Sequence, residues 1–595
     1  MKQFSTTPTG PGQRFFPQLH QYLAALLLLL LAAPLARAQA PAWQTAVGLG
    51  GVGASIINAT AADASGNVYV TGGFSGTVVL GGTTLTSAGL RDVFVAKWSP
   101  ATGSFVWAQR AGGTGEEYAN GIAVSGSSVY LIGVFGSTQV AFGTTTLVNA
   151  GASPTGLNYD GYVAKLTDAG GSGSFVWAQG FGGSDREFGN AIGVSGTNVY
   201  IAGLFYSASA AFGPIALANS APTASPATTD VYMARLVDAG ATSSFSWAEH
   251  TGSAGSEYCS DLAVSGSSIY LTGSFTGATV SLGTLALANS TPGPEDIFVT
   301  KITDQGTAPR FEWAQRAGGT GTDQALRITA NSNGVYIMGR FSGSAMASTT
   351  STFGSTVLAN AGLTDVFVAK LSDAGSTAGF VWAQQLGGSG YDSAYGLAVR
   401  GNSVYVAGNF QGTATFGPTS FTSRGGDDVF VARLADAGPT AQVVWAQQAG
   451  GTGNDDGYGA LIVGSSVYVG GNIGLPATFG SLTVAGSAGT QAGFLASITD
   501  LVGLATTPAG PLAGTSLYPN PAHATATVQL PPVPGASSAT LTITDALGRV
   551  VRTVTVALPA AGLRHALDLA GLPAGLYAVR VAAGDRSATH RLVVE

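Results

Sequence analysis

The stretch Asp365-Val-Phe-Val-Ala-Lys370, followed by Phe380-Val-Trp-Ala-Gln384, recurs along the chain and decides its architecture. Further copies begin at Asp92 and Phe105, Asp160 and Phe175, Asp230 and Phe245, Asp296 and Phe311, and Asp428 and Val443. The tryptophans of the second pattern stand at positions 43, 107, 177, 247, 313, 382 and 445, so successive copies lie 63 to 70 residues apart. The sequence therefore predicts a repeat array.

Each repeat contains short runs rich in Val, Tyr and Phe, bounded by Gly, Asn and Asp, which are typical of β-strands. In the sixth repeat these runs are 396–399, 403–410, 428–434 and 442–448. Helical periodicity is absent over the whole array. Four strands per unit, repeated radially, are typical of a β-propeller blade.

The number of strands predicts how the array closes. The second strand occurs seven times, with tyrosines at 69, 130, 200, 270, 336, 405 and 468, and the third also occurs seven times, ending with 493–497. The tryptophan strand occurs seven times too, but its first copy precedes the first unit and none follows Ser497. We expect a ring closed by the N-terminal strand, which removes exposed sheet edges. An open solenoid of β units is the alternative.

The order of motifs in a repeat carries a resemblance. Gly66-Asn-Val-Tyr-Val-Thr-Gly-Gly-Phe74 is followed by Asp-x-Phe-Val-Ala-Lys, Trp-Ala-Gln and Gly-Gly-x-Gly. Over residues 41–503 this resembles the bacterial seven-bladed β-propeller repeat of the SBBP family. The resemblance implies an extracellular protein without assigned catalytic residues. The predicted fold class is all-β: a seven-bladed propeller at 39–503, followed by a small Ig-like β-sandwich.

Composition narrows the possible partners and chemistry. The net charge is −7 and charged residues are only 9% of the chain, without a basic stripe, so nucleic acid is not expected as a partner. Cys259 is the single cysteine, which excludes an intrachain disulfide, and we expect it to be a small buried group at the start of a strand. Because the chain has only five histidines, we do not expect a Ser-His-Asp arrangement or a histidine zinc site.

The N-terminus has the pattern of a secretory signal peptide. Lys2 and Arg14 precede the apolar run 22–31, and Ala36-Arg-Ala38 is a small-x-small cleavage signal. We expect residues 1–38 to be removed between Ala38 and Gln39. The run is short for a membrane span, so an uncleaved anchor is the alternative, and no other stretch is a candidate span.

The C-terminal module differs from the repeats. After a linker at 504–514, short strands are predicted at 540–544, 550–556, 576–581 and 590–594. Tyr518-Pro-Asn-Pro-Ala522, Asp545-Ala-Leu-Gly-Arg549 and 569–581 resemble the type A C-terminal sorting domain of the type IX (Por) secretion system, at 515–595. The resemblance implies export through the periplasm, with the type IX machinery as partner, to the outer-membrane surface or the medium. An Ig-like ligand-binding domain is the alternative.

Carboxylates are the remaining candidates for chemistry. Glu116, Asp185, Glu257, Asp323, Asp392 and Asp455 follow a glycine-rich turn in successive units. We expect them to cap these turns by accepting backbone N–H bonds, and the aspartate that begins each third strand to be structural too. Weak calcium sites are the alternative, and no other cofactor is expected. The repeated Trp, Tyr and Phe residues are expected to pack between units rather than to stack on sugars.

A ligand site on a repeat array should break its symmetry. The second and third units each carry about six extra residues before the third strand, and loops on a rigid scaffold often bind ligands. The first insertion contains Leu157, Asn158 and Tyr159, which suit a polar or sugar ligand, and the second contains 220–226. Neutral drift of surface loops is the alternative.

The sequence therefore predicts a secreted, surface-bound or released protein that acts as a non-enzymatic binding or adhesion module for a glycan or protein. The alternatives are a propeller glycoside hydrolase or lyase that uses paired carboxylates and a structural surface-layer component.

Overall fold

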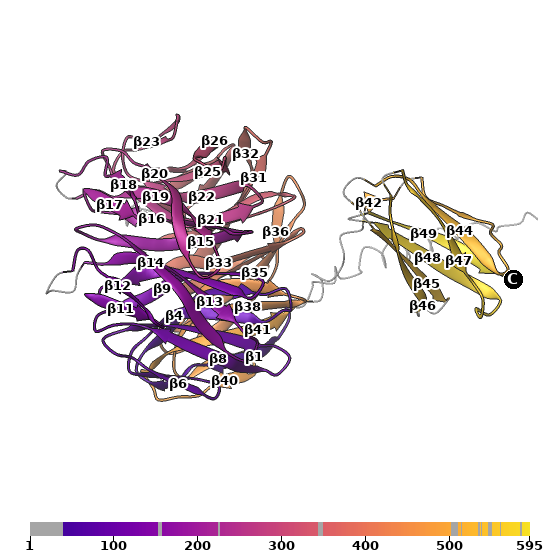
Figure 1. Ribbon diagram of the computed structural model, residues 1–595, viewed down its shortest axis with the longest axis horizontal. Helices are drawn as coiled ribbons and strands as arrows, with labels where there is room; N and C mark the ends of the chain where they lie inside the picture. Colours follow the sequence, from indigo (N-terminus) through magenta and orange to yellow (C-terminus); the bar gives the residue numbers. More distant parts are fainter. Residues whose placement is uncertain are drawn as a thin grey trace, which may run out of the picture.

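The computed structural model describes residues 40–152, 158–223, 227–342, 349–500, 510–512, 514–533, 536, 538–545, 550–559, 561–583 and 586–595. These residues form many small antiparallel sheets of about four strands, followed by a C-terminal two-sheet region (Figure 1). The predicted cleavage site between Ala38 and Gln39 lies outside the described residues. Within them, no helix has the length and apolar character that a membrane span requires.

Seven four-stranded units, named sheets 1 to 7, follow one another in the described repeat region. Sheets 1 to 3 contain β3 (Ser55–Ala62), β4 (Val68–Phe74), β7 (Asp92–Ser99) and β8 (Ser104–Ala111); β9 (Glu117–Ser125), β10 (Ser128–Phe135), β13 (Asp160–Asp168) and β14 (Gly173–Phe181); and β15 (Glu187–Ser195), β16 (Asn198–Phe205), β19 (Asp230–Asp238) and β20 (Ser243–Thr251).

Sheets 4 to 6 contain β21 (Glu257–Ser265), β22 (Ser268–Phe275), β25 (Asp296–Asp304) and β26 (Pro309–Gly319); β27 (Asp323–Asn331), β28 (Gly334–Ser342), β31 (Thr364–Asp373) and β32 (Ala378–Gly388); and β33 (Asp392–Arg400), β34 (Ser403–Phe416), β35 (Thr419–Asp436) and β36 (Ala441–Gly451). Sheet 7 contains β37 (Asp456–Val463), β38 (Ser466–Gly474), β41 (Gln491–Thr499) and β1 (Trp43–Gly48).

The third strands are buried on both faces, which explains their run of apolar residues. Val366, Phe367 and Val368 of β31 are all fully buried, because neighbouring sheets cover both sides of sheet 5. A strand covered on both faces has no polar face, and its sequence therefore lacks alternation. Cys259 in β21 is also buried, as predicted.

Short hairpins between second and third strands were not predicted. They are β5 (Thr77–Leu80) with β6 (Thr83–Thr86), β11 (Gln139–Phe142) with β12 (Thr145–Val148), β17 (Ser209–Phe212) with β18 (Ile215–Ala218), β23 (Thr279–Leu282) with β24 (Leu285–Ala288), β29 (Thr350–Phe353) with β30 (Thr356–Ala359), and β39 (Ala477–Phe479) with β40 (Leu482–Val484). The turns need a positive φ, which glycines supply, for example Gly81 at 61° and Gly143 at 60°. A further strand, β2 (Gly50–Val52), pairs with β5.

The two ends of the repeat region meet. β1 pairs antiparallel with β41, with Ala46 opposite Ala496 and Gly48 opposite Phe494, which is the pairing that the strand count predicts. The indigo strand β1 accordingly lies beside strands β40 and β41, which come from the far end of the repeat region (Figure 1). The first strands of consecutive sheets contact one another in order from β3 to β37, and β37 also contacts β3.

The C-terminal region has two sheets around one apolar core. The five-stranded sheet contains β42 (Gly510–Pro511), β49 (Arg586–Val594), β48 (Gly575–Ala583), β45 (Ser538–Asp545) and β46 (Val550–Ala557), and the three-stranded sheet contains β43 (Ser516–Tyr518), β44 (Thr525–Leu530) and β47 (Leu563–Asp568). Val528, Leu541 and Val579 are buried between them. Four of these strands agree with the predicted ones, whereas the strands of the three-stranded sheet were not among those predicted.

Candidate binding site

An aspartate at or just after the end of a third strand, with its side chain at most 15% exposed, ties each of sheets 1 to 6 to the sheet that follows. Asp436 of sheet 6 accepts hydrogen bonds from Tyr336 Oη (2.7 Å), Lys370 Nζ (2.7 Å) and Trp382 Nε1 (3.1 Å), all of sheet 5. Burial raises the pKa of Asp436, but these bonds outweigh it and hold the pKa below its ordinary value. We call this arrangement the aspartate latch. The other latch residues are Asp168, Asp238, Asp304, Asp373 and Asp500.

The latch explains the repeated motifs. The lysine or arginine that ends Asp-x-Phe-Val-Ala-Lys, the tyrosine of the second strand and the tryptophan of the fourth strand all point to one acceptor in the next sheet. The tyrosine and tryptophan also lie against each other within a sheet, with ring centroids 6.2 Å apart for Tyr336 and Trp382. These repeated residues hold the frame, as predicted, and none of them is available to a ligand.

A second repeated carboxylate caps the turn before the first strand. The side chains of Glu257, Asp323, Asp392 and Asp455 accept the N–H of Ser253, Gly319, Gly388 and Gly451 at 2.7–3.1 Å. The predicted capping role is therefore confirmed at these four positions.

The prediction was wrong at Glu116 and Asp185. In sheets 2 and 3 the capping residues are Glu117 and Glu187, which accept the N–H of Gly113 (2.8 Å) and Gly183 (2.7 Å). The capping carboxylate stands five residues after the first glycine of the turn, Gly112 or Gly182, in every sheet that has one, because the turn has a constant length. Glu116 instead accepts a bond from Tyr159 Oη at 3.3 Å.

Burial makes these capping carboxyls hard to ionise. It raises the pKa of Glu187 and Glu257 to about 8, and the nearby aspartates Asp160 and Asp230 add to the effect. The pKa values of Asp323 and Asp392 rise to about 7 for the same reason. Near neutral pH Glu187 and Glu257 therefore contribute to the fold mainly as neutral groups, whereas Asp323 and Asp392 are partly ionised.

The loop predicted to bind a ligand is partly described. Leu157 lies outside the described residues. Asn158 donates its amide Nδ2 to the carbonyl oxygens of Gly151 (2.8 Å) and Ser184 (3.2 Å), so it holds its loop to the next sheet. Tyr159 is partly exposed, and its ring centroid lies 6.2 Å from that of Phe188. The binding role of these residues stays a prediction.

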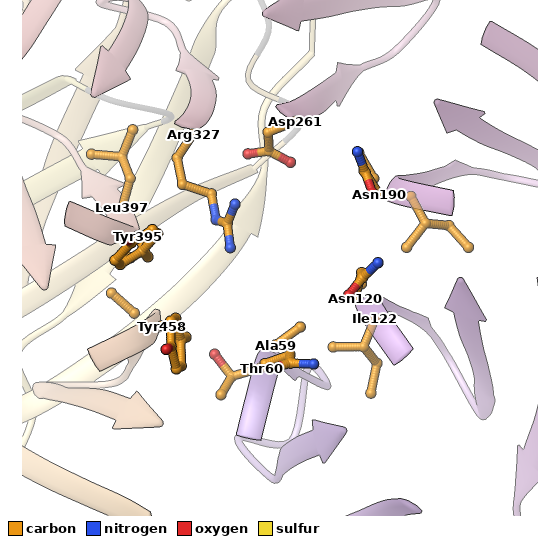
Figure 2. A pocket seen from close by; sticks show the side chains of 17 residues that line it. Ala59, Thr60, Asn120, Ile122, Asn190, Asp261, Arg327, Tyr395, Leu397 and Tyr458 are labelled. Carbon is orange, nitrogen blue, oxygen red and sulfur yellow. The ribbon is translucent and has the colours of Figure 1, made fainter. Parts of the chain in front are cut away.

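The repeats also differ along their first strands. Each of these strands has a bulge three residues after its cap position, and the bulge residues of sheets 1 to 7 are Asn58, Asn120, Asn190, Ser260, Leu326, Tyr395 and Tyr458. The residues that follow them are Ala59, Gly121, Ala191, Asp261, Arg327, Gly396 and Gly459. Most of these residues, from all seven first strands, line one pocket of about 160 Å³, which we call the central pocket (Figure 2).

One wall of the central pocket is built of amides. Asn58, Asn120 and Asn190 each donate Nδ2 to a backbone carbonyl of the next sheet, at 2.9, 3.0 and 2.8 Å. This bond fixes the plane of each amide. Within the described part of the chain no hydrogen bond engages their Oδ1 atoms, which are left as acceptors.

The next part of the wall carries opposite charges. Asp261 accepts the N–H of Leu262 (2.9 Å) and, across the sheet boundary, of Ile328 (3.0 Å). Burial raises its pKa to about 6, although the charge of Arg327 opposes this. Arg327 donates Nη1 to the carbonyl of Leu326 (2.9 Å), and Figure 2 shows its guanidinium pointing into the pocket.

Two tyrosines form the remaining wall. The ring centroids of Tyr395 and Tyr458 lie 5.3 Å apart at an interplanar angle of 56°. The strands come this close because Gly396 and Gly459 follow the tyrosines: a Cβ at Gly396 would lie 2.8 Å from the backbone of Ala460. Burial and the charge of Asp456 raise the pKa of Tyr458, so its hydroxyl stays protonated.

The pocket thus offers amide and carboxylate acceptors, guanidinium donors and two aromatic faces within one small space. Sequence reasoning missed it because it searched insertions rather than substitutions. Counting three and four residues from each capping carboxylate would have shown that asparagine changes to tyrosine, and small residues to Asp261 and Arg327, from one repeat to another. In the described residues, no group of three or more His, Cys, Asp or Glu side chains is placed to hold a metal ion.

Comparison with known proteins identifies one part of the chain. No curated protein matches the chain. Residues 516–595, which form the C-terminal two-sheet region, match the family model described as a secretion system C-terminal sorting domain. This domain implies interaction with the type IX secretion machinery. The chain therefore carries a type IX sorting domain and is secreted across the outer membrane to the cell surface or the medium.

Proposed function

We propose that the seven sheets form a closed seven-bladed β-propeller of the SBBP type, and that this propeller is a non-enzymatic binding module which the sorting domain delivers to the cell exterior. The pairing of β1 with β41, the contact of β37 with β3 and the six aspartate latches support a closed ring. The sequence resemblance of residues 41–503 supports the same architecture.

The central pocket is the observation that carries the binding function. The frame residues repeat from sheet to sheet, whereas the pocket residues change from amide to charged to aromatic around the ring. Substitutions on the wall of a pocket in a repeating scaffold are expected where a ligand, which lacks the symmetry of the scaffold, makes its contacts.

Binding fits the pocket better than hydrolysis does. Glycoside hydrolysis uses two carboxyl groups roughly 5–9.5 Å apart. Among the described residues that line the pocket, Asp261 is the one carboxylate, and histidine is absent. The proposal is therefore adhesion or capture of a small polar group that belongs to a glycan or a protein.

Binding of the full chain to a printed glycan array and to cell-envelope fragments tests this function. We expect the double variant Arg327→Leu/Tyr458→Leu to lose at least about tenfold in affinity, since it removes donors and an aromatic face. Arg310→Leu, which changes an exposed arginine of β26, is the matched control and should bind as the native chain does. Equal binding by the double variant would move the site elsewhere. A broad glycosidase screen on the same samples would reveal turnover, and hydrolysis that depends on Asp261 would favour the hydrolase.

A further inference from the structure

We propose that the central pocket holds a single six-membered sugar ring, bound by the amide, carboxylate and guanidinium groups and covered by the two tyrosines. This inference rests on the proposed binding function and names the chemical class of its ligand. Three properties of the pocket carry it: its size, the balance of its charges and the placement of its acceptors.

The size fits one ring. A cavity of about 150 Å³ accommodates benzene, which is a six-membered ring. The central pocket measures about 160 Å³ and is partly open to solvent. One sugar ring therefore fills it, and the opening allows the ring to be the end of a longer glycan.

The charges favour a neutral ligand. Asp261 and Arg327 follow the bulges of adjacent strands, β21 and β27, so their charges cancel at the pocket wall. Asp261 would repel a simple anion, and Arg327 would repel a simple cation. A free amino acid, which carries both charges, is the competing ligand. Asp261 already accepts two backbone N–H groups, which leaves it less able to pair with an ammonium group.

The acceptors suit hydroxyl groups. The Oδ1 atoms of Asn58, Asn120 and Asn190 come from three consecutive sheets, and each amide plane is fixed by its bond to the next strand. A row of fixed acceptors matches the several hydroxyl donors of a sugar at little entropic cost. Arg327 supplies donors in a planar fork, which can reach two neighbouring ring oxygens.

The tyrosines complete the match. Sugars carry an apolar face of C–H groups, and burial of this face against Tyr395 and Tyr458 removes it from water. The amide wall comes from sheets 1 to 3, and the tyrosine wall comes from sheets 6 and 7. Both walls line the same pocket, so one ligand can contact both (Figure 2).

Saturation-transfer difference NMR on the full chain tests the ligand class directly. The sugar probes are D-glucose, D-galactose, D-mannose, L-fucose and N-acetyl-D-glucosamine, and the zwitterionic probes are glycine and L-glutamate. We expect transfer to the ring protons of at least one sugar and none to the amino acids. Tyr458→Leu should weaken sugar binding about tenfold, and Arg327→Leu by a similar factor. Arg310→Leu should leave it unchanged, and melting temperatures confirm that each variant is folded.

Three outcomes would overturn the inference. Transfer to an amino acid but to no sugar would assign the pocket to zwitterions, and the binding function would stand. Sugar binding that survives both pocket substitutions would place the sugar elsewhere. If no probe binds while capture of envelope fragments still depends on Arg327 and Tyr458, the pocket binds a ligand that is not a sugar ring. If no probe binds and the capture of envelope fragments also does not depend on Arg327 and Tyr458, the proposed function itself is refuted.

Discussion

Six contacts between neighbouring sheets carry an aspartate latch, whereas in the described residues the contact of sheet 7 with sheet 1 is built without one. Pro100 stands where Asp168 and its counterparts accept bonds, and Ser497 stands at the lysine position. Trp98 of β7 in sheet 1 stands where the third strands of the other sheets have a leucine or isoleucine. It packs in one buried cluster with Tyr468 of sheet 7. Neighbouring sheets are thus joined in two ways, by buried ion pairs within the array and by a shared strand with aromatic packing where its ends meet.

The difference between the six latched contacts and the contact of sheet 7 with sheet 1 reflects how each pair of sheets is assembled from the chain. The six latched contacts join sheets that are continuous in sequence, so the latch adds orientation to a boundary that the chain already connects. At the seventh boundary the chain also passes from one sheet to the next, from β1 to β3, but sheet 7 is completed by β1, which is joined to β41 by strand pairing and not by a connecting loop. Trp43 of that strand packs edge-on against Phe479, 5.1 Å away, and donates Nε1 to the carbonyl of Gln448 (3.3 Å).

Deletion of residues 39–48 should give the largest effect. It removes β1, leaves the edge of β41 unpaired and takes the buried Trp43 out of the core of sheet 7. Loss of the tryptophan alone costs about 3–5 kcal/mol, and the exposed edge favours aggregation. We expect lost solubility or a large fall in melting temperature. An unchanged melting curve would show that β1 does not hold the ends together.

Asp436→Asn breaks one latch and should give the next largest effect. Lys370 would keep its charge in a site where only 8% of its side chain is exposed, without the carboxylate that balances it. Removal of one partner of a buried pair costs about 3–5 kcal/mol. Urea unfolding measures the loss. Glu312→Gln, at an ion pair with an exposed arginine, is the control and should unfold as the native chain does. A loss no greater than in this control would make the latch dispensable.

The dependence of stability on pH distinguishes the caps from the latches. Folding raises the pKa values of Glu187 and Glu257 to about 8, so their contribution is complete below the unfolded value of about 4.3 and is lost as the pH rises through 8. Folding lowers the pKa values of the latch residues Asp168, Asp238, Asp304, Asp373 and Asp436, so their contribution is lost as the pH falls below about 3.9. We expect the highest melting temperature in mildly acidic buffer.

Glu187→Gln sharpens this test. The variant keeps an acceptor for Gly183 N–H but cannot ionise, so its melting temperature should fall less than that of the native chain between about pH 5 and about pH 8.5. Sheet 1 has Ser55 at the cap position, where it accepts the N–H of Gly493 from sheet 7, so the unlatched boundary should contribute nothing to this profile. A profile that rises towards alkaline pH would contradict the assignment.

Ser497→Ala should give the smallest effect. Ser497 shares a hydrogen bond of 2.8 Å with Thr45 of β1, and the loss of one such bond costs about 0.5–1.5 kcal/mol. Urea unfolding should therefore show a loss well below that of Asp436→Asn. Equal losses would mean that the two kinds of boundary are equally sensitive to their polar groups.

Much of the fold could be predicted because it depends on residues that repeat. The tryptophan spacing and the missing fourth strand after Ser497 were enough to pair β1 with the last unit. The hairpins, such as β5 with β6, were missed because their short alternating runs also suit a loop. The pocket could not be predicted because bulges decide which side chains turn inward, and a bulge of one residue has no signature in a glycine-rich strand. The confusion of Glu116 with Glu117 arose from two adjacent carboxylates, only one of which faces the core.

The pairing of β1 with β41 has a consequence for the order in which the protein is made. β1 precedes the other strands of the repeat region and is synthesised before them, and its partner follows about 450 residues later in the chain, from Val47 to Leu495. The sorting domain comes after β41, so every polypeptide that carries the export signal also carries both members of this pair. A chain that is interrupted before β41 lacks the sorting domain, so we expect that it does not cross the outer membrane.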